Sequence, residues 1–412
     1  MDEAHENSYV SDITPKYDTK DVAAALAKRY GALFLMGTAT PDFIRYYKAK
    51  QGEFLLLELK ERTGGGVLPR MLVTDMRKEL AEGNRSAFGR ALQAEIRRNL
   101  EKGEQTMLFL NRRGYATFVS CRSCGHVMKC PECDLTYTYH AKEHALACHY
   151  CGRRAPLPKV CPVCGSKYIR YFGTGTQKIE EEAGKLFPEA RILRMDLDTT
   201  LTKHSHEKIL AAFAAGEADI LIGTQMIAKG HDFQNVGLVV ILNADTQLLS
   251  PAARAREHLF STLMQVAGRA GRANGKGRVL IQTRFKDEPL FEALRLQDYR
   301  RFANETLEER RENFSVPFVY QALITAESDA LAKAVLFLET IARRGRGVAS
   351  GEVRVFDPVP MPLVRLMNRE RAQLLVEGDE RKTLHRFLRG LLEGVKSPSD
   401  VVWQVEIDPT DV

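Results

Sequence analysis

The sequence predicts an α/β protein that carries a small cysteine-rich insert. Patterns typical of helices and strands alternate along most of its 412 residues, as a sheet of parallel strands requires. The alternation stops near residue 119 and resumes near residue 170. All eight cysteines fall between Cys121 and Cys164, inside this interruption. We therefore expect one sheet architecture with an insert of different chemistry.

The part of the chain before the insert predicts two helices and several strands. One helix is predicted at 21–32 (DVAAALAKRYGA). Another is predicted around 88–100, because Phe88, Leu92, Ile96 and Leu100 recur every four positions and would form one buried face. Strands are predicted at 33–42 (LFLMGTATPD, ending in a loop), 54–59 (FLLLEL), 67–76 (VLPRMLVTDM) and 106–110 (TMLFL).

The alternation resumes after the insert. Helices are predicted at 179–187 (IEEEAGKLF) and 206–216 (HEKILAAFAAG). Strands are predicted at 191–196 (RILRMD), 218–223 (ADILIG) and 237–245 (GLVVILNAD). A charged helix from Asp298 to Asn313 opens a final segment, and the break at 284–290 indicates a boundary before it.

Composition excludes several classes of protein. Hydrophobic residues make up 44% and charged residues 27%, as in an ordinary soluble protein. The longest apolar stretch, around Val236 to Leu242, is too short to span a bilayer, and the acidic N-terminus has no apolar signal segment. We therefore expect a cytoplasmic protein with no membrane partner. The net charge of +7 permits a nucleic-acid partner without requiring one.

The cysteines form four CxxC pairs, which favours metal binding over disulfides in a cytoplasmic chain. Four thiolates hold one Zn²⁺ tetrahedrally, so eight suffice for two Zn²⁺ ions. A redox or disulfide cluster is the alternative, but it would not need four evenly repeated pairs. Spacing alone does not decide which pairs share an ion. The pairs are Cys121 and Cys124, Cys130 and Cys133, Cys148 and Cys151, and Cys161 and Cys164.

Two motifs suggest nucleotide chemistry. In Asp2-Glu3-Ala4-His5, an Asp can hold the Mg²⁺ of Mg-ATP through water, and the adjacent Glu can orient the attacking water. Alone, this motif could equally be a solvated acidic terminus. In QVAGRAGR (265–272), we expect Arg269 and Arg272 on one helical face, where guanidinium groups would stabilise charge during phosphoryl transfer. Gln265 would share that face; a basic surface helix is the alternative.

Two further segments fit the same chemistry. GTATP (37–41) places hydroxyl groups at the end of a predicted strand, and ILIGTQMIAKGHDF (220–233) places a loop after another. Thr224 and Lys229 could meet nucleic-acid phosphates and Asp232 could face the nucleotide, whereas Gly230 could be only a backbone hinge. The candidate nucleotide-binding residues are Gly37, Thr38, Thr40, Gly230 and Asp232. The candidate nucleic-acid-binding residues are Arg112, Arg113, Thr224, Gln225 and Lys229.

These motifs together resemble those of a known family. DEAH, GTATP, FLNRRG, GTGTQ, ILIGTQMIAKGHDF and QVAGRAGR occur in the order expected of superfamily 2 helicases. The cysteine insert directly after FLNRRG resembles that of primosomal replication-restart helicases, the PriA type, also called primosomal protein N′. The resemblance is to the C-terminal part of that family and covers essentially all 412 residues.

The resemblance implies two RecA-like lobes, a double zinc module and a C-terminal α+β domain. By position, residues 1–104 would be a truncated first lobe, 105–286 the second lobe interrupted by the zinc module at 119–170, and 287–412 the C-terminal domain. The implied catalytic residues are Asp2, Glu3, His5, Gln265, Arg269 and Arg272. The implied zinc ligands are Cys121, Cys124, Cys161 and Cys164 for one ion, and Cys130, Cys133, Cys148 and Cys151 for the other.

The implied activity is ATP-driven 3′-to-5′ unwinding of DNA at stalled forks. Its implied partners are forked and single-stranded DNA, primosome proteins and single-strand-binding protein. The sequence contains no phosphate-binding loop G-x-x-x-x-G-K-[ST], so we expect a fragment with little ATP turnover of its own. The alternatives are a non-catalytic zinc-dependent DNA- or primosome-binding module and an RNA helicase.

Overall fold

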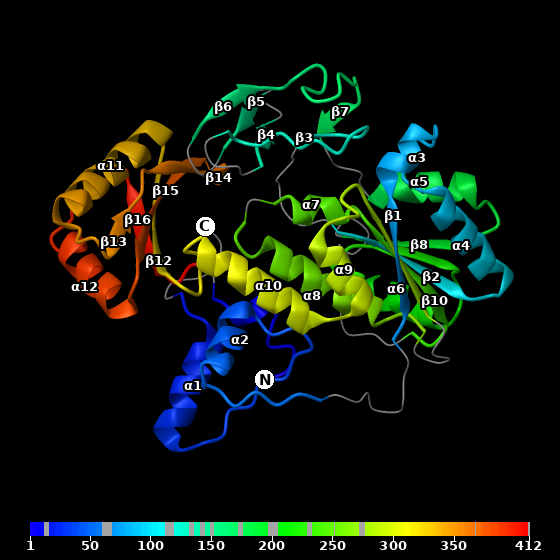
Figure 1. Ribbon diagram of the computed structural model, residues 1–412, viewed down its shortest axis with the longest axis horizontal. Helices are drawn as coiled ribbons and strands as arrows, with labels where there is room; N and C mark the ends of the chain where they lie inside the picture. Colours follow the sequence, from blue (N-terminus) through cyan, green and yellow to red (C-terminus); the bar gives the residue numbers. More distant parts are fainter. Residues whose placement is uncertain are drawn as a thin grey trace. The chain divides into compact units, whose positions relative to one another are not determined.

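The protein folds into two compact units, seen in the computed structural model (Figure 1). One unit combines residues Met1–Glu58 with Tyr299–Val412, and the other consists of Leu59–Asp298. The structure describes residues 1–11, 16–59, 68–111, 119–131, 136–140, 145–148, 152–171, 176–196, 205–228, 233–250, 252–271, 277–366 and 368–410.

The unit Leu59–Asp298 is built on a sheet of six parallel strands, which confirms the predicted α/β class. Their order is β1-β11-β10-β2-β9-β8. All described residues of β2, β9 and β10 are buried, as expected for strands that are covered on both faces. The strands are β1 (Arg70–Asp75), β2 (Gln105–Leu110), β8 (Ile192–Met195), β9 (Ile220–Gly223), β10 (Val236–Leu242) and β11 (Arg278–Thr283).

Helices cover both faces of this sheet. The predicted stripe of α4 (Arg90–Glu101) and the apolar face of α5 (Thr176–Leu186) pack against one face, where Phe88, Leu92 and Ile96 are fully buried. Figure 1 shows α8 and α9 on the other side of the strands. The remaining helices are α3 (Met76–Ala81), α6 (Ser205–Ala214), α7 (Ala244–Leu248), α8 (Ala255–Ala267), α9 (Pro289–Leu296) and the 3₁₀ helix η3 (Gln225–Ala228).

The two units divide the chain differently from the expected domains. Strand β1 pairs in parallel with β11 along its whole length, so residues 70–104 belong to the same sheet as the predicted second lobe. At the other end, α9 remains in this unit because Leu290, Phe291 and Leu294 are fully buried there. The two compact units are divided at 58–59 and 298–299. The domain boundaries that the resemblance implies, at 104–105 and 286–287, stay predictions.

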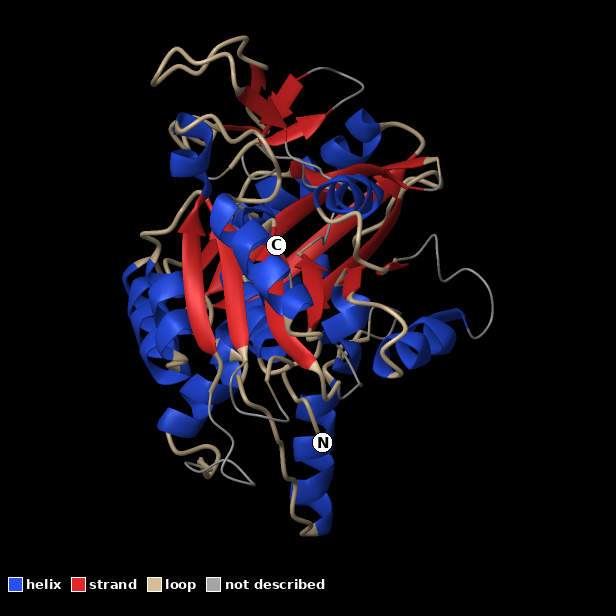
Figure 2. Cartoon of the chain, turned by 90° about the vertical axis from the view of Figure 1, so that its right-hand side faces the viewer, coloured by secondary structure: helices blue, strands red, loops and turns tan. Residues whose placement is uncertain are grey.

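The cysteine-rich insert emerges between β2 and α5 and forms two small antiparallel sheets (Figure 2). One sheet pairs β3 (Val119–Cys121) with β7 (Ile169–Tyr171) where the chain leaves and re-enters the unit. The other consists of β4 (Thr138–His140), β5 (Ala145–Ala147) and β6 (Arg154–Pro156). Val127 contacts Leu249 and Phe285, and this contact joins the insert to the large sheet's unit.

The unit that contains both termini includes an antiparallel sheet covered by two helices. Its strands run β13-β15-β12-β16, with β14 paired to β15. Ile324, Leu338, Leu374 and Leu384 are fully buried between this sheet and helices α11 and α12. The elements are β12 (Tyr320–Ser328), α11 (Leu331–Val348), β13 (Val353–Val355), β14 (Val359–Leu366), β15 (Arg369–Gly378), α12 (Arg381–Leu392) and β16 (Val402–Ile407).

Three helices complete this unit. The predicted helix at 21–32 is present as α1 (Thr19–Tyr30), and the predicted charged helix as α10 (Tyr299–Glu312). Helix α2 (Phe43–Lys50) packs on α10 through Phe43 and Phe302, whose rings lie 5.5 Å apart. A short 3₁₀ helix, η1, spans Asn7–Tyr9.

The strands predicted at 33–42 and 54–59 are wrong, because both segments are irregular where the structure describes them. Leu33, Leu55 and Leu57 are 93%, 85% and 70% exposed, so their apolar side chains have no core to enter in this chain. The sequence pattern had the composition of a buried strand, but a strand also needs a neighbour to pair with.

Candidate functional site

The DEAH and GTATP motifs meet in the unit that contains both termini. The Met1 amino group donates to the Leu35 carbonyl (2.9 Å), the Gly37 amide to the Met1 carbonyl (2.9 Å), and the Ala4 amide to the Gly37 carbonyl (3.0 Å). The two segments therefore lie side by side like neighbouring parallel strands. Although no strand is assigned at 33–42, the end of this segment occupies the position that its motif requires.

His5 connects the two motifs through its side chain. Its Nδ1 lies 2.9 Å from the Thr38 hydroxyl oxygen and 3.3 Å from a Glu3 carboxylate oxygen. Thr38 Oγ1 in turn accepts a hydrogen bond from the Thr40 amide at 3.1 Å. Asp2 and Glu3 are exposed, so both carboxylates are accessible to a ligand. The imidazole ring of His5 thus connects the Glu3 carboxylate to the Thr38 hydroxyl of the GTATP segment.

A cluster of charged residues beneath these motifs was not predicted from the sequence. Lys20 is 95% buried, and its ammonium group donates to the Ala4 carbonyl at 3.2 Å and lies 3.6 Å from the carboxylates of Asp18 and Asp42. Asp42 also caps helix α2 by accepting from the Arg45 amide. A buried lysine paired with two carboxylates fixes the backbone of the DEAH segment. In the sequence, this charged cluster is indicated only by Asp18 and Asp42, each of which directly precedes a helix.

Arg45 belongs to the same cluster. Its guanidinium group lies 2.8 Å from carboxylates of both Asp18 and Asp21. Burial alone would lower the pKa of Arg45, but the carboxylates of Asp42, Asp18 and Asp21 outweigh it and raise the pKa. The arginine is therefore held charged, and it links helices α1 and α2 on the side that supports the DEAH segment.

The QVAGRAGR motif lies in the other unit, and its helical prediction is partly wrong. Helix α8 ends at Ala267, so Gln265 is on its last turn while Arg269 follows in a turn. Beyond the helix the chain turns back at Gly271, which has a φ of +68° and whose amide donates to the Val236 carbonyl at 2.8 Å. Arg269 is 91% buried. The predicted role of Arg269 toward a nucleotide stays a prediction.

Part of the predicted site lies outside the described residues. Thr224 follows strand β9 and is half-buried, and Gln225 begins η3. Their roles toward nucleic acid stay predictions. The predicted residues outside the described part of the chain are Arg112, Arg113, Cys133, Cys151, Lys229, Gly230, Asp232 and Arg272.

The outer cysteine pairs converge on one point. The thiol sulfurs of Cys121, Cys124, Cys161 and Cys164 all lie within 4.8 Å of one another. Two of the sulfur–sulfur distances are 3.6 and 3.7 Å. Four sulfurs about 2.3 Å from a tetrahedral Zn²⁺ would be about 3.8 Å apart, so these residues fit a zinc ion. This grouping is the one that the family resemblance implied.

The local backbone already favours ionised thiols. Burial alone would raise the pKa of the Cys121 thiol, but the backbone amides of Cys124 and Ser123 lower it to about 7. Burial raises the pKa of Cys124 to about 12. Without a metal the cluster thus tends to hold one thiolate among protonated neighbours, whereas a bound Zn²⁺ would hold all four as thiolates.

The described half of the inner cysteine set repeats the same local structure. In the outer pairs, Cys121 and Cys161 each begin the same turn: a glycine four residues later, with positive φ, donates its amide to the cysteine carbonyl at 2.9 Å. Cys148 and Gly152 form this turn with the same 2.9 Å hydrogen bond. Cys130 and Cys148 are buried, and both contribute to raising the pKa of the buried Tyr137 to about 12, after burial itself. The Cys148 turn therefore has the same local structure as the turns of the outer set, and a zinc ion held by the inner set stays a prediction.

Comparison with known proteins agrees with this geometry. Family models match residues 166–274 (helicase conserved C-terminal domain), 130–156 (PriA DNA helicase Cys-rich region domain) and 313–410 (primosomal protein N C-terminal domain). The replication restart protein PriA of Bacillus subtilis is 43% identical over 396 residues, which cover 96% of this chain and 49% of that protein. This chain is similar to PriA-type proteins over nearly its whole length.

A second relative extends the match to the whole chain. PriA of Haemophilus influenzae is 37% identical over 413 residues, covering 100% of this chain and 56% of that protein. This chain thus spans about half the length of these PriA relatives. Among solved structures, RecG bound to a three-way DNA junction aligns over 68% of this chain and 27% of that one, with 15% identity and a TM-score of 0.37, which is too low to support an argument.

The PriA matches place named modules on the described structure. The helicase C-terminal domain model covers strands β8, β9 and β10 of the large sheet, and the Cys-rich model covers Cys130 and Cys148. The primosomal C-terminal model covers the antiparallel sheet of the other unit. A zinc-binding cysteine-rich region and a helicase domain are therefore parts of this chain. Among the described helices, none is long and apolar enough to cross a membrane.

Proposed function

We propose that this chain is part of an ATP-dependent 3′-to-5′ DNA helicase that restarts replication at stalled forks. The observation that carries this proposal is the 2.9 Å contact between His5 of the DEAH motif and Thr38 of the GTATP motif. In an ATP-driven motor, one motif must detect the state of the nucleotide, and a second motif must transmit that state to the rest of the protein. A direct side-chain contact between two such motifs provides that connection.

The nucleotide chemistry would be divided among a few residues. Asp2 would hold Mg²⁺ through water, and the ion would neutralise charge that develops on the phosphates. Glu3 would orient the attacking water, and its contact with His5 would relay its state to Thr38. Arg269 would stabilise the charge on the transferring phosphoryl group.

Two sets of four cysteines would hold two Zn²⁺ ions in the insert. The outer set has the sulfur geometry described above, and the Cys148 turn supports the inner set. These ions would supply folding free energy, about 10–16 kcal/mol per site, to an insert with a small apolar core. By relationship to the PriA proteins, DNA, primosome proteins and single-strand-binding protein are the proposed partners, and the cytoplasm is the proposed location.

By itself the chain should hydrolyse little ATP, because its sequence contains no phosphate-binding loop to neutralise the β- and γ-phosphates. The test is DNA-stimulated ATP hydrolysis by this chain alone, and after addition of the N-terminal half of Bacillus subtilis PriA. We expect turnover only in the mixture, and its loss with Arg269→Ala. DNA binding without turnover in any mixture would favour the alternative, a non-catalytic zinc-dependent binding module.

A further inference from the structure

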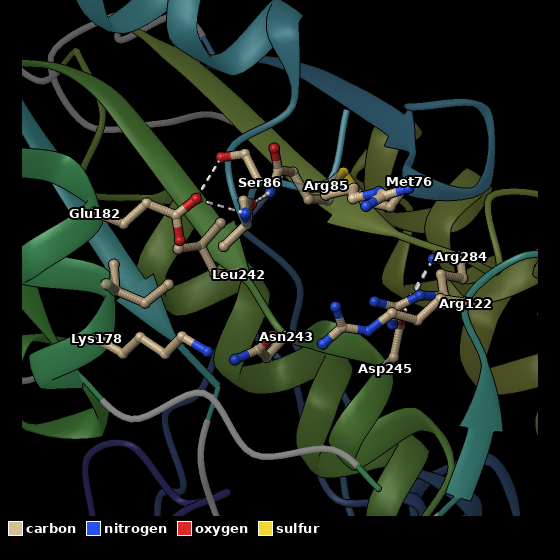
Figure 3. Close-up of a pocket in the computed structure, with 13 residues that line it drawn as sticks. Met76, Arg85, Ser86, Arg122, Lys178, Glu182, Leu242, Asn243, Asp245 and Arg284 are labelled. Carbon is tan, nitrogen blue, oxygen red and sulfur yellow. Dashed lines mark hydrogen bonds and ion pairs between the residues drawn. The ribbon is translucent and has the colours of Figure 1, made fainter. Parts of the chain in front are cut away.

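A basic pocket lies at the carboxyl ends of three strands of the large sheet. It has a volume of about 140 Å³ and is lined by residues that directly follow β1, β10 and β11, by the first turns of α5 and by one residue of the zinc insert. Four of its lining side chains are basic: Arg85, Arg122, Lys178 and Arg284. Figure 3 shows Lys178, Asn243 and Arg122 pointing toward one another across it. This edge is where open α/β sheets bind ligands.

The two carboxylates in the pocket are already engaged within the protein. Glu182 accepts from the Ser86 hydroxyl at 2.5 Å and from the Ala87 amide at 2.9 Å. Asp245 accepts from the Thr283 hydroxyl at 2.5 Å and forms an ion pair with Arg284 at 3.1 Å. Four basic groups thus face two acidic ones, and the pocket keeps an excess of positive charge.

The basic groups lie close enough to influence one another. Burial lowers the pKa of Arg284; Asp245 opposes this effect, and the charge of Arg122 lowers the pKa further. Like charges gathered in a concave site are stabilised by an anion between them. The N-terminal end of helix α5, beside Lys178, adds partial positive charge of its own.

The shape and lining of the pocket favour a phosphate group over a whole nucleotide. Among the described residues that line it, none is aromatic, so a base would find no ring on which to stack. Asn243, held in the left-handed conformation with φ of 59°, adds a side-chain amide to the basic groups. Arginines, a lysine and an amide are the groups that contact backbone phosphates in protein–nucleic acid complexes.

Arg122 makes this pocket dependent on the zinc insert. It lies between Cys121 and Cys124, two of the four converging cysteines, and its amide donates to the Tyr168 carbonyl at 3.0 Å. The same turn packs tightly on the sheet's unit, because a Cβ on Gly125 would lie 3.3 Å from the Arg77 side chain. A metal that fixes the turn therefore also fixes the Arg122 side chain at the pocket.

We propose that this pocket binds a backbone phosphate of single-stranded DNA, and that zinc in the outer cysteine set holds Arg122 in place for it. The proposal rests on the proposed function, since it assigns one contact of the DNA that a helicase grips. It adds a metal-dependent phosphate site formed jointly by the zinc insert and the large sheet.

The test measures binding of a labelled single-stranded oligonucleotide to the full chain by fluorescence anisotropy at several salt concentrations. Arg122→Gln and Lys178→Gln should each weaken binding about tenfold and reduce the salt dependence by roughly one phosphate contact. The matched controls are Arg154→Gln, an exposed arginine of the same insert, and Lys185→Gln, an exposed lysine of the same helix. Both controls should bind like the unaltered chain.

Zinc provides the second arm. Removal of zinc, or Cys161→Ser, should weaken binding by the unaltered chain but add little to the loss in Arg122→Gln. Unchanged affinity of both pocket variants, at normal zinc content, would overturn the proposal while leaving DNA binding intact. Equal competition by inorganic phosphate or ATP would overturn the assignment to a polynucleotide. Absence of DNA binding by the unaltered chain would overturn the proposed function together with this site.

Discussion

At the residue scale, Gly277 shows how closely the QVAGRAGR segment packs against the sheet. A Cβ at this position would lie 2.4–2.6 Å from backbone atoms of Ala270 and Gly271. The Gly277 carbonyl also accepts from the Arg70 amide at 3.0 Å, where β1 begins. A side chain here cannot be accommodated by rotation of a neighbour, since the neighbour is backbone.

We therefore expect Gly277→Ala to lower the free energy of unfolding by about 3 kcal/mol, the upper range for an overpacked site. Gly184→Ala is the matched control: Gly184 lies within helix α5 and a Cβ there would meet nothing within 4 Å. It should raise the free energy of unfolding by about 0.5–1 kcal/mol. Denaturant unfolding followed by circular dichroism measures both. Equal stability of the two variants would contradict the packing described here.

Individual residues differ in how well the sequence predicts them. The cysteines were predictable because metal ligands recur at fixed spacing, and the converging sulfurs of the outer set match that reasoning. Lys20 and Arg45 were not, because nothing in their local sequence separates a buried cation from a solvated one. Their burial depends on Asp18 and Asp42, which only the fold brings together.

At the scale of elements, the turns that begin at Cys121, Cys148 and Cys161 are self-contained units. A glycine with positive φ and one backbone hydrogen bond shape the turns at Cys121, Cys148 and Cys161 alike. Such turns need their metal to converge, because the insert has a small apolar core of its own. Loss of one ligand should therefore affect one zinc site and leave the other.

The purified chain is expected to hold about two zinc ions, and Cys161→Ser about one, since each ion takes four thiolates. Ser123→Ala is the control: Ser123 contacts Ser166 at 2.8 Å within the same site without offering a sulfur. It should keep the full zinc content. Metal analysis by mass spectrometry gives the counts. One zinc in the unaltered chain would show that the inner set does not form a second site.

An ion pair between Arg191 and Asp219 lies at the start of the neighbouring strands β8 and β9. Arg191 donates to both carboxylate oxygens of Asp219, at 2.7 and 3.1 Å, and to the Gly216 carbonyl at 2.9 Å. The Arg191 side chain is the main cause that lowers the pKa of Asp219 from its ordinary value. Because the folded pKa lies below the unfolded one, the contribution is complete above about pH 4 and is lost as the pH falls through the folded pKa.

Asp219→Asn should therefore cost about 1 kcal/mol of stability at neutral pH, a modest amount because Arg191 is largely exposed. The difference from the unaltered chain should shrink as the pH falls below 4. Thermal unfolding across that range measures it. A constant difference at all pH values would mean that the carboxylate charge is not what stabilises this edge.

Elements of the large sheet were predictable to a few residues, whereas two strands before it were not. The strands at 106–110, 218–223 and 237–245 appear because their apolar runs are buried on both faces, and the strand at 191–196 appears at the sheet edge, where it is mostly half-buried. FLLLEL has an equally apolar run yet forms no strand in the described chain. The sequence pattern of a segment indicates its tendency to form a strand. Whether a partner strand lies beside it depends on the fold.

At the scale of the whole molecule, the chain's two units cut across the sequence order. The DEAH and GTATP motifs lie in one unit and QVAGRAGR in the other. The division into these two units could not be read from the sequence, because β1 pairs with β11, more than a hundred residues later in the chain. Long-range pairing of this kind leaves no local mark in composition.

The unit that contains both termini has several large apolar side chains exposed to solvent. Leu33, Leu35, Leu55 and Leu57 are 93%, 65%, 85% and 70% exposed, in two segments of strand-forming composition. Exposed segments of this kind offer both apolar side chains and backbone groups to another chain. We therefore expect the chain to self-associate as its concentration rises.

Leu35→Lys combined with Leu57→Lys should suppress that association, since charged side chains on an exposed strand-like segment oppose pairing with another chain. Leu336→Lys is the matched control, because Leu336 is 62% exposed but lies on helix α11, whose backbone groups are satisfied within the helix. Sedimentation velocity over a range of concentrations distinguishes them. Association that persists in the double variant, or disappears equally with Leu336→Lys, would place the contact elsewhere. If it disappears only in the double variant, the two segments that contain Leu35 and Leu57 form the surface through which the chain associates.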